Sequence, residues 1–184
     1  MEIIVVDPTY DREDRDREKF INDLQTDAQS LSSDLQISDT DIGRGADWPA
    51  IFLSIGGLFF LGKKINENLE AWVSLARKFI KFIENLRKKS WKFRIDEIGA
   101  TLLAIERIII LEQGNISSIE KISENIVAIS PFTGREPEGL RRRPDCLYMQ
   151  IFKVNDNTVY IFGIKSKGSV EIEYKINTAD WMTF

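Results

Sequence analysis

Histidine and cysteine, two side chains widely used for acid–base, nucleophilic and metal chemistry, are almost absent from this sequence of 184 residues. It has no histidine, and Cys146 is its one cysteine. Histidine is the side chain most often used for proton transfer near neutral pH, so Ser-His-Asp and Cys-His sites cannot form within the chain. A single cysteine excludes an intrachain disulfide and a CxxC metal pair. The enzyme class left open is one in which carboxylates such as Asp39, Asp41 and Asp96 surround a divalent metal.

Two glycine-containing stretches share little with the cofactor motifs that they resemble. Residues 39–45 (DTDIGRG) match an EF-hand loop at its first two acidic positions, but the glycine offset and the terminal glutamate are missing. Residues 55–62 (IGGLFFLG) match neither a Walker loop nor a GxGxxG motif. We therefore expect neither a metal nor another cofactor, and we predict that the protein is not an enzyme.

Basic charge is concentrated in the middle of a chain whose net charge is −4. Residues 1–47 carry −8 and residues 63–94 carry +7. A basic segment of this kind binds an acidic protein, anionic lipid or nucleic acid, or it pairs with the acidic N-terminal segment of the same chain. The composition leaves both alternatives open.

The candidate partner-binding residues belong to two basic clusters. On a helix over the basic segment, Arg77, Lys78, Lys81 and Lys88 lie opposite an apolar seam, which is the pattern of a basic amphipathic helix. The second cluster is a loop in which three guanidinium groups can clamp phosphate or carboxylate groups. It consists of Arg141, Arg142 and Arg143. Nucleic-acid binding is not expected, because the chain has no recognised module and little basic charge elsewhere.

The apolar run from Trp48 to Leu61 is the segment most similar to a membrane span. As a helix it would be about 21 Å long, short of the ~30 Å hydrocarbon core. We expect it to be buried, and contact with a membrane surface remains an alternative. The N-terminus has no basic leader followed by a long apolar core, so we expect no secretory signal and a cytoplasmic protein.

Apolar or small residues recur at steps of three and four from residue 48 to residue 86, which predicts a long amphipathic helix over residues 48–88. Such a helix would be about 60 Å long, whereas a domain of this size is about 40 Å across, so we expect a break, most simply near Gly62. We expect its packing partner to belong to the same chain, and a second copy is the alternative. The helix-packing seam is predicted to comprise Ile55, Leu58, Ile65, Leu69, Trp72, Phe79, Ile83 and Leu86.

Shorter elements are expected on both sides of this helix. Before it, a strand at Glu2–Val6, a helix within residues 11–31 and a strand at Leu35–Ser38 predict a β-α-β start. After it, Phe93–Asp96 is a strand candidate and residues 97–114 are a helix candidate, in which residues 105–111 also suit a strand. Ser117 and Glu120 have capping-box spacing, which predicts a further helix carrying Ile119, Ile122 and Ile126.

The C-terminal part has the clearest strand pattern. Side chains alternate in residues 146–154, 158–166 and 169–176, with turn residues between these runs, which predicts a three-stranded antiparallel meander. The predicted fold class is α+β, with a β-α-β unit, a long and broken amphipathic helix, and this meander. We expect residues 1–92 and 93–184 to form two parts of one compact unit.

The first half resembles the effector-associated constant component family of bacterial conflict systems. The resemblance rests on EIIVV as an opening strand, a polar helix, DLQI, and then FLSIGGLFFLGKKINENLEAW followed by the strand WKFRID. It covers about half of the chain, and nothing in it accounts for residues 98–184. It implies a non-enzymatic adaptor that couples sensors and effectors, and it carries over no catalytic residue.

The sequence thus predicts a protein–protein interaction or adaptor module with an unidentified protein partner. A homo-oligomer formed through the helix seam is a further expectation. The alternatives are a peripheral membrane protein that uses residues 48–61 with the basic helix face, and a metal-dependent enzyme that uses carboxylates.

Overall fold

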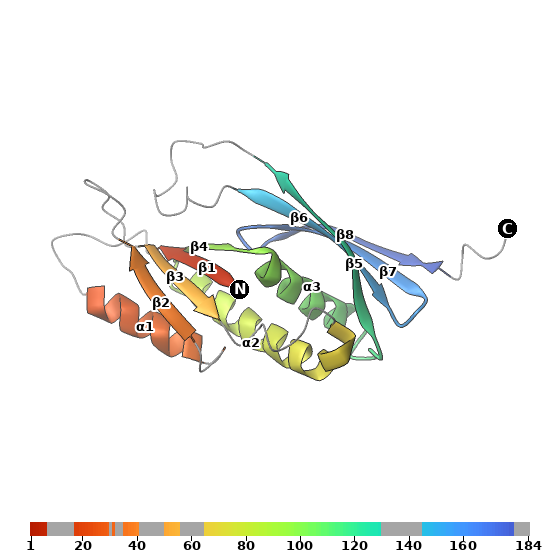
Figure 1. Ribbon diagram of the computed structural model, residues 1–184, viewed down its shortest axis with the longest axis horizontal. Helices are drawn as coiled ribbons and strands as arrows, with labels where there is room; N and C mark the ends of the chain where they lie inside the picture. Colours follow the sequence, from red (N-terminus) through yellow and green to blue (C-terminus); the bar gives the residue numbers. More distant parts are fainter. Residues whose placement is uncertain are drawn as a thin grey trace.

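The computed structural model describes residues 1–6, 17–29, 31, 35–40, 50–55, 65–129 and 145–178. In this part of the chain, three α-helices and two four-stranded sheets form the fold (Figure 1). The predicted α+β class is confirmed.

The N-terminal sheet has the strand order β2-β3-β1-β4, and every neighbouring pair is antiparallel. Strands β1 and β2 run in the same direction. The predicted β-α-β start is therefore present, and strand β3 lies between its two strands in the sheet. The β-α-β-β-α-β order of this unit is the split topology of ferredoxin-like folds. Its elements are β1 (Glu2–Val6), α1 (Arg17–Gln29), β2 (Leu35–Thr40), β3 (Ala50–Ile55), α2 (Leu69–Lys88) and β4 (Lys92–Ile95).

The segment expected to be a long helix with a break, residues 48–88, contains both strand and helix in its described residues. Ala50–Ile55 is strand β3, which pairs with β1 along one edge and with β2 along the other. A short apolar run suits a strand as well as a helix, and here hydrogen bonding to two neighbouring strands decides the outcome. Among the described residues of this segment, helical structure begins with the 3-10 turn η2 (Ile65–Asn68), which leads into α2. The prediction of helix was therefore wrong for residues 50–55, and Leu58 and Gly62 lie outside the described residues.

Helix α2 has one buried face and one exposed, basic face. Its 20 residues span about 30 Å, which a single compact unit accommodates. Buried along it are Trp72, Leu75, Ala76, Phe79, Phe82, Ile83 and Leu86. The seam residues Ile65, Trp72, Phe79, Ile83 and Leu86 thus lie in the core of their own chain, and Leu69 packs half-buried against it. For Ile55 the structure describes the backbone alone.

The C-terminal sheet has the strand order β5-β6-β7-β8, and all of its pairs are antiparallel. Its strands are β5 (Ile119–Ala128), β6 (Cys146–Val154), β7 (Thr158–Lys165) and β8 (Val170–Asn177). The predicted three-stranded meander is confirmed as β6, β7 and β8. The asparagine-rich turn between β6 and β7 is tight, with Asn155 and Asp156 both at positive φ.

The helix expected after Ser117 is instead strand β5, the fourth strand of this sheet. The pairing of β5 with β6 shifts between Lys121 and Ser123, so Ile122 is an extra residue in a β-bulge. The extra residue breaks the two-residue alternation of the strand. The isoleucines on either side of it therefore lie three and four residues from it, which is also the spacing along one face of a helix. Ser117 does not cap a helix; its amide and hydroxyl both donate to the Asn155 side-chain oxygen, at 2.8 and 3.0 Å.

Helix α3 (Glu97–Leu111) packs between α2 and the C-terminal sheet (Figure 1). This element was expected to be a helix, with residues 105–111 left open, and it is helical through Leu111. Asp96 caps its N-terminus by accepting a hydrogen bond from the Gly99 amide at 2.9 Å. The second Asp96 oxygen accepts from the Glu2 amide at 2.6 Å, which connects the start of α3 to strand β1.

The two sheets meet at strand β4. The Ile95 amide donates to the Ser166 carbonyl oxygen at 2.9 Å, and the Tyr148 hydroxyl donates to the Ile95 carbonyl oxygen at 2.9 Å. Both bonds join the edge strand of the N-terminal sheet to the C-terminal sheet. One hydrophobic cluster includes Val5 and Leu24 from the first half and Phe152 and Phe162 from the second. The halves expected at residues 1–92 and 93–184 thus have a shared core among the described residues.

Candidate functional site

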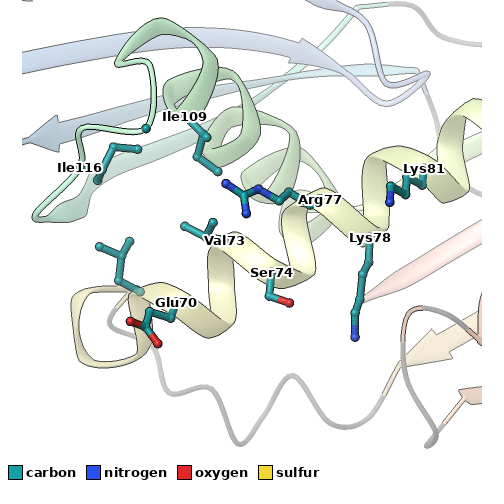
Figure 2. A pocket seen from close by; sticks show the side chains of 10 residues that line it. Glu70, Val73, Ser74, Arg77, Lys78, Lys81, Ile109 and Ile116 are labelled. Atoms are coloured by element: carbon teal, nitrogen blue, oxygen red, sulfur yellow. The ribbon is translucent and has the colours of Figure 1, made fainter.

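A groove of about 430 Å³ runs along the exposed face of α2 and is closed on one side by the C-terminal end of α3 (Figure 2). Helix α2 supplies most of its wall, because residues one turn apart on a helix line up on one face. Residue Ile109 of α3 and the chain that follows this helix supply the other side. The lining residues are Leu69, Glu70, Val73, Ser74, Arg77, Lys78, Lys81, Ile109, Gly114 and Ile116.

Apolar and basic lining residues lie toward opposite ends of the groove. Toward the start of α2 the groove is apolar, where half-buried Leu69 and Val73 face Ile109 and Ile116 across it. Toward the end of α2 it is basic, and Arg77 and Lys81 are among the exposed cations there. From residue 69 to residue 81 the helix rises about 18 Å. A ligand that filled the groove would therefore be apolar at one end and negatively charged at the other.

Three cations, Arg77, Lys78 and Lys81, line the basic end of the groove. In the part of the chain that the structure describes, none of these three forms an ion pair or a hydrogen bond through its side chain. Figure 2 shows the Arg77 guanidinium extending toward Ile109, while Lys78 points away from α3. The lone acidic side chain among the lining residues, Glu70, lies near the apolar end.

Some cations elsewhere on the described surface have partners in the same chain, whereas exposed Lys88 and Lys92 have none there. Lys89 pairs with Asp27 of α1 at 2.8 Å, so the basic segment does neutralise part of the acidic N-terminal segment. Lys175 pairs with Glu112 at 2.8 Å, where this bond and a hydrogen bond from Tyr160 hold the pKa of the Glu112 carboxyl below its ordinary value. The groove is distinguished by having three cations without such partners along one wall.

Another paired cation lies beside the junction of the two sheets. Lys167 contacts Asp145 at 2.9 Å. Burial alone would raise the pKa of the Asp145 carboxyl, but hydrogen bonds from Lys167 and Ser166 and the charge of Arg94 lower it. The chain thus uses this lysine to stabilise its own fold.

The sequence identified part of this groove and missed the rest. Of the predicted partner-binding residues, Arg77, Lys78 and Lys81 line it, whereas Lys88 is exposed at the end of α2, outside the lining. The arginines 141–143 lie outside the described residues, so the structure does not relate them to the groove. Ile109 and Ile116 had not been predicted as site residues, because α3 and the following turn must first pack against α2.

A turn at Gly114 brings Ile116 back to the groove. Gly114 has φ +81, a conformation that favours glycine, and its amide donates to the Ile109 carbonyl oxygen at 3.0 Å. This ends α3 and reverses the chain. A glycine after a helical stretch was the one sequence signal for this turn, but it did not indicate which residues the turn would bring to α2.

The carboxylates named for the metal-dependent alternative are described only in part. No group of three or more histidine, cysteine, aspartate or glutamate side chains in this part of the chain could hold a metal ion. Asp96 is buried as a helix cap, and the pKa of its carboxyl is raised by burial against the lowering effect of the Gly99 and Glu2 amides. The side chains of Asp39 and Asp41 are not among those described.

No helix in the described ranges is long and apolar enough to cross a membrane. Comparison of the chain with models of protein families, with curated proteins and with solved structures finds no match. The resemblance of the first half to a conflict-system family therefore stays a prediction from the residues.

Proposed function

We propose that this chain is a non-enzymatic protein–protein interaction module, and that the groove beside α2 binds an acidic, amphipathic segment of a partner protein. The observation that carries the proposal is the presence of three cations without a partner at one end of a groove whose other end is apolar. In a chain of net charge −4, cations without partners gathered on one surface favour a negatively charged ligand.

The spacing of the lining residues favours a helical segment over a small anion. Residues 69, 73, 77 and 81 recur every fourth position and form a continuous ridge along α2. A second helix laid beside such a ridge places its own side chains at the same repeat, as in helix-in-groove recognition. The partner's leucine-like side chains would cover Leu69, Val73, Ile109 and Ile116. Its carboxylates would then lie over the three cations.

Reversing two charges of the groove is expected to weaken binding of a model peptide by at least about tenfold, equivalent to about 1.4 kcal/mol. The probe is a fluorescent helical peptide of about four turns, with leucines in its first half and glutamates in its second half. The variant is Arg77→Glu/Lys81→Glu in the full chain, and fluorescence anisotropy measures the dissociation constant. Binding to the unmodified chain should also weaken as salt is added, because the contacts are exposed.

The matched control is Lys88→Glu/Lys92→Glu, which makes the same change in net charge at two exposed residues outside the groove. We expect this control to change the dissociation constant by less than about threefold, since these charges act only at long range. Equal weakening by both double variants would contradict the groove as the binding site. Binding of the chain to anionic lipid vesicles without binding to the peptide would contradict a protein partner.

The adaptor role in a bacterial conflict system is the narrower form of this proposal. Its support is the resemblance of the first half of the chain, together with a groove suited to capturing one segment of another protein. A partner identified by peptide capture and encoded beside this chain would support the adaptor role. Capture of the peptide alone supports only the interaction module.

A further inference from the structure

Glu70 is the only acidic side chain among the described residues that line the groove beside α2, and it lies toward the apolar end (Figure 2). Its side chain is exposed and forms no ion pair or hydrogen bond with any residue that the structure describes. The cations Arg77, Lys78 and Lys81 lie toward the other end. The groove thus carries unpaired charges of both signs, separated along its length.

Glu70 is too far along α2 from these cations to neutralise them. The rise of the helix separates it from Arg77 by about 10 Å and from Lys78 by about 12 Å. The Debye length is about 8 Å at physiological ionic strength, so the attraction between these exposed charges is largely screened. Ser74, which lies between Glu70 and Lys78 on the side of α2 that faces away from α3, is exposed and uncharged (Figure 2). Both signs of charge are therefore left to a bound ligand.

A helical segment bound along α2 would meet these charges in a fixed order. Lys78 follows Glu70 by eight residues, which is about two turns of helix. In the favourable direction, a cation of the segment lies opposite Glu70 and its carboxylates lie opposite the three cations. In the reverse direction, carboxylates would lie opposite Glu70, and like charges placed together at an interface disfavour binding. The charges of the groove therefore distinguish the two directions.

We propose that Glu70 determines which partner segment the groove accepts, by pairing with a lysine or arginine of that segment and so setting the direction in which it binds. This inference rests on the function proposed for the groove. It adds one requirement to the acidic, amphipathic partner, which is a cation beside its apolar half, about two turns of helix from its carboxylates. A segment whose charges are all negative would bind less tightly, because one carboxylate would then face Glu70.

Glu70 also has a structural role, which the test must separate from recognition. It lies in the first turn of α2, where a carboxylate interacts favourably with the positive end of the helix dipole. That role affects the stability of the helix, but it does not make binding depend on the sign of a charge in the bound segment. The useful measurement is therefore the ratio of the dissociation constants of two peptides for the same variant, because a change in helix stability affects both peptides alike.

The two probes are forms of the leucine–glutamate peptide that carry either a lysine or a glutamate in the first half, two turns before the glutamates that face the cations. Fluorescence anisotropy with the full chain measures both dissociation constants. We expect the unmodified chain to bind the lysine form about three- to tenfold more tightly, because an exposed attraction replaces a repulsion. Glu70→Lys should reverse this preference, and Glu70→Gln should reduce it to less than about twofold. Circular dichroism checks that both variants are folded.

The matched control is Glu84→Lys, which makes the same change in charge at an exposed residue of α2 outside the groove lining, about 21 Å of helix rise from Glu70. This control should leave the preference for the lysine form unchanged. Equal binding of both forms to the unmodified chain, or a preference that survives Glu70→Lys, would overturn this inference and leave the proposed function standing. Absence of binding by both forms would overturn the proposed function and this inference with it.

Discussion

Replacing Phe79 with alanine is expected to lower the free energy of unfolding by about 3–5 kcal/mol. Phe79 is fully buried on α2, where its ring lies 3.3 Å from the position that a Cβ atom of Gly99 on α3 would take. Alanine would leave a cavity between the two helices, and the close contact at Gly99 leaves little freedom for them to collapse into it. Urea denaturation followed by circular dichroism measures the change.

The control for this prediction is Ile110→Ala, which removes an exposed apolar side chain from α3. We expect this control to change the free energy of unfolding by less than about 1 kcal/mol, because surface substitutions rarely have large effects. A loss of less than about 1 kcal/mol for Phe79→Ala as well would mean that α2 does not pack tightly on α3. The groove beside α2 would then lose its structural basis, because this packing positions both of its walls.

Replacing Asp96 with alanine is expected to cost about 2–3 kcal/mol of stability. The carboxylate caps α3 through the Gly99 amide and also accepts from the Glu2 amide, so alanine removes the acceptor of two backbone donors. Asp96 itself is buried, which makes an unsatisfied donor there costly. Asp96→Asn is the matched control. Asparagine is an equally good cap for Gly99, but its side chain has one oxygen only. When that oxygen accepts from Gly99, the NH₂ group faces the Glu2 amide, which has then lost its acceptor.

The stability difference between the unmodified chain and Asp96→Ala is expected to depend on pH. Burial raises the pKa of the Asp96 carboxyl above 3.8 in the folded chain, so the folded state binds this proton more tightly than the unfolded state does. The contribution of Asp96 to stability therefore increases as the pH falls through its folded-state pKa toward 3.8. Unfolding midpoints in urea at neutral and acidic pH should show the difference widening at acidic pH; a narrowing would contradict the direction of the shift.

The elements that the sequence predicted correctly have periodic patterns that tertiary packing leaves intact. Strand β6 and most of β7 alternate buried and half-buried side chains, and β6, β7 and β8 pair with one another in chain order. Helix α3 combines a cap at Asp96 with apolar residues at helical spacing, and it is buried without interruption from Gly99 to Ile105. In both cases local preference and the final packing favour the same structure.

The two elements that the sequence predicted incorrectly both depend on partners far along the chain. Strand β3 is apolar enough to be a buried helix, and its pairing with β1, about fifty residues earlier, determines that it is a strand. Strand β5 carries a bulge at Ile122, and this extra residue gives its isoleucines helical spacing. Residue spacing alone does not reveal a bulge, because the bulge is defined by the register of the neighbouring strand β6.

The candidate site was predictable to the extent that it lies on one helix. The exposed cations Arg77, Lys78 and Lys81 follow from the pattern of α2 alone. The apolar end of the groove does not, because Ile116 reaches α2 only through the turn at Gly114. A basic amphipathic helix alone is compatible with a lipid surface as well as with a protein. The groove that α2 forms with α3 favours an elongated segment of a protein over a lipid surface.

Amide chemical-shift mapping tests the central claim, that the groove beside α2 binds an acidic amphipathic segment, most directly. Isotope-labelled full-length chain is titrated with the leucine–glutamate peptide, and the peptide with lysine in place of glutamate serves as the control. The account predicts that the largest shifts fall in residues 69–81 and 109–116, that the amides of β6 to β8 change little, and that the lysine peptide has no effect. Largest shifts on the C-terminal sheet, or equal shifts with both peptides, would contradict it.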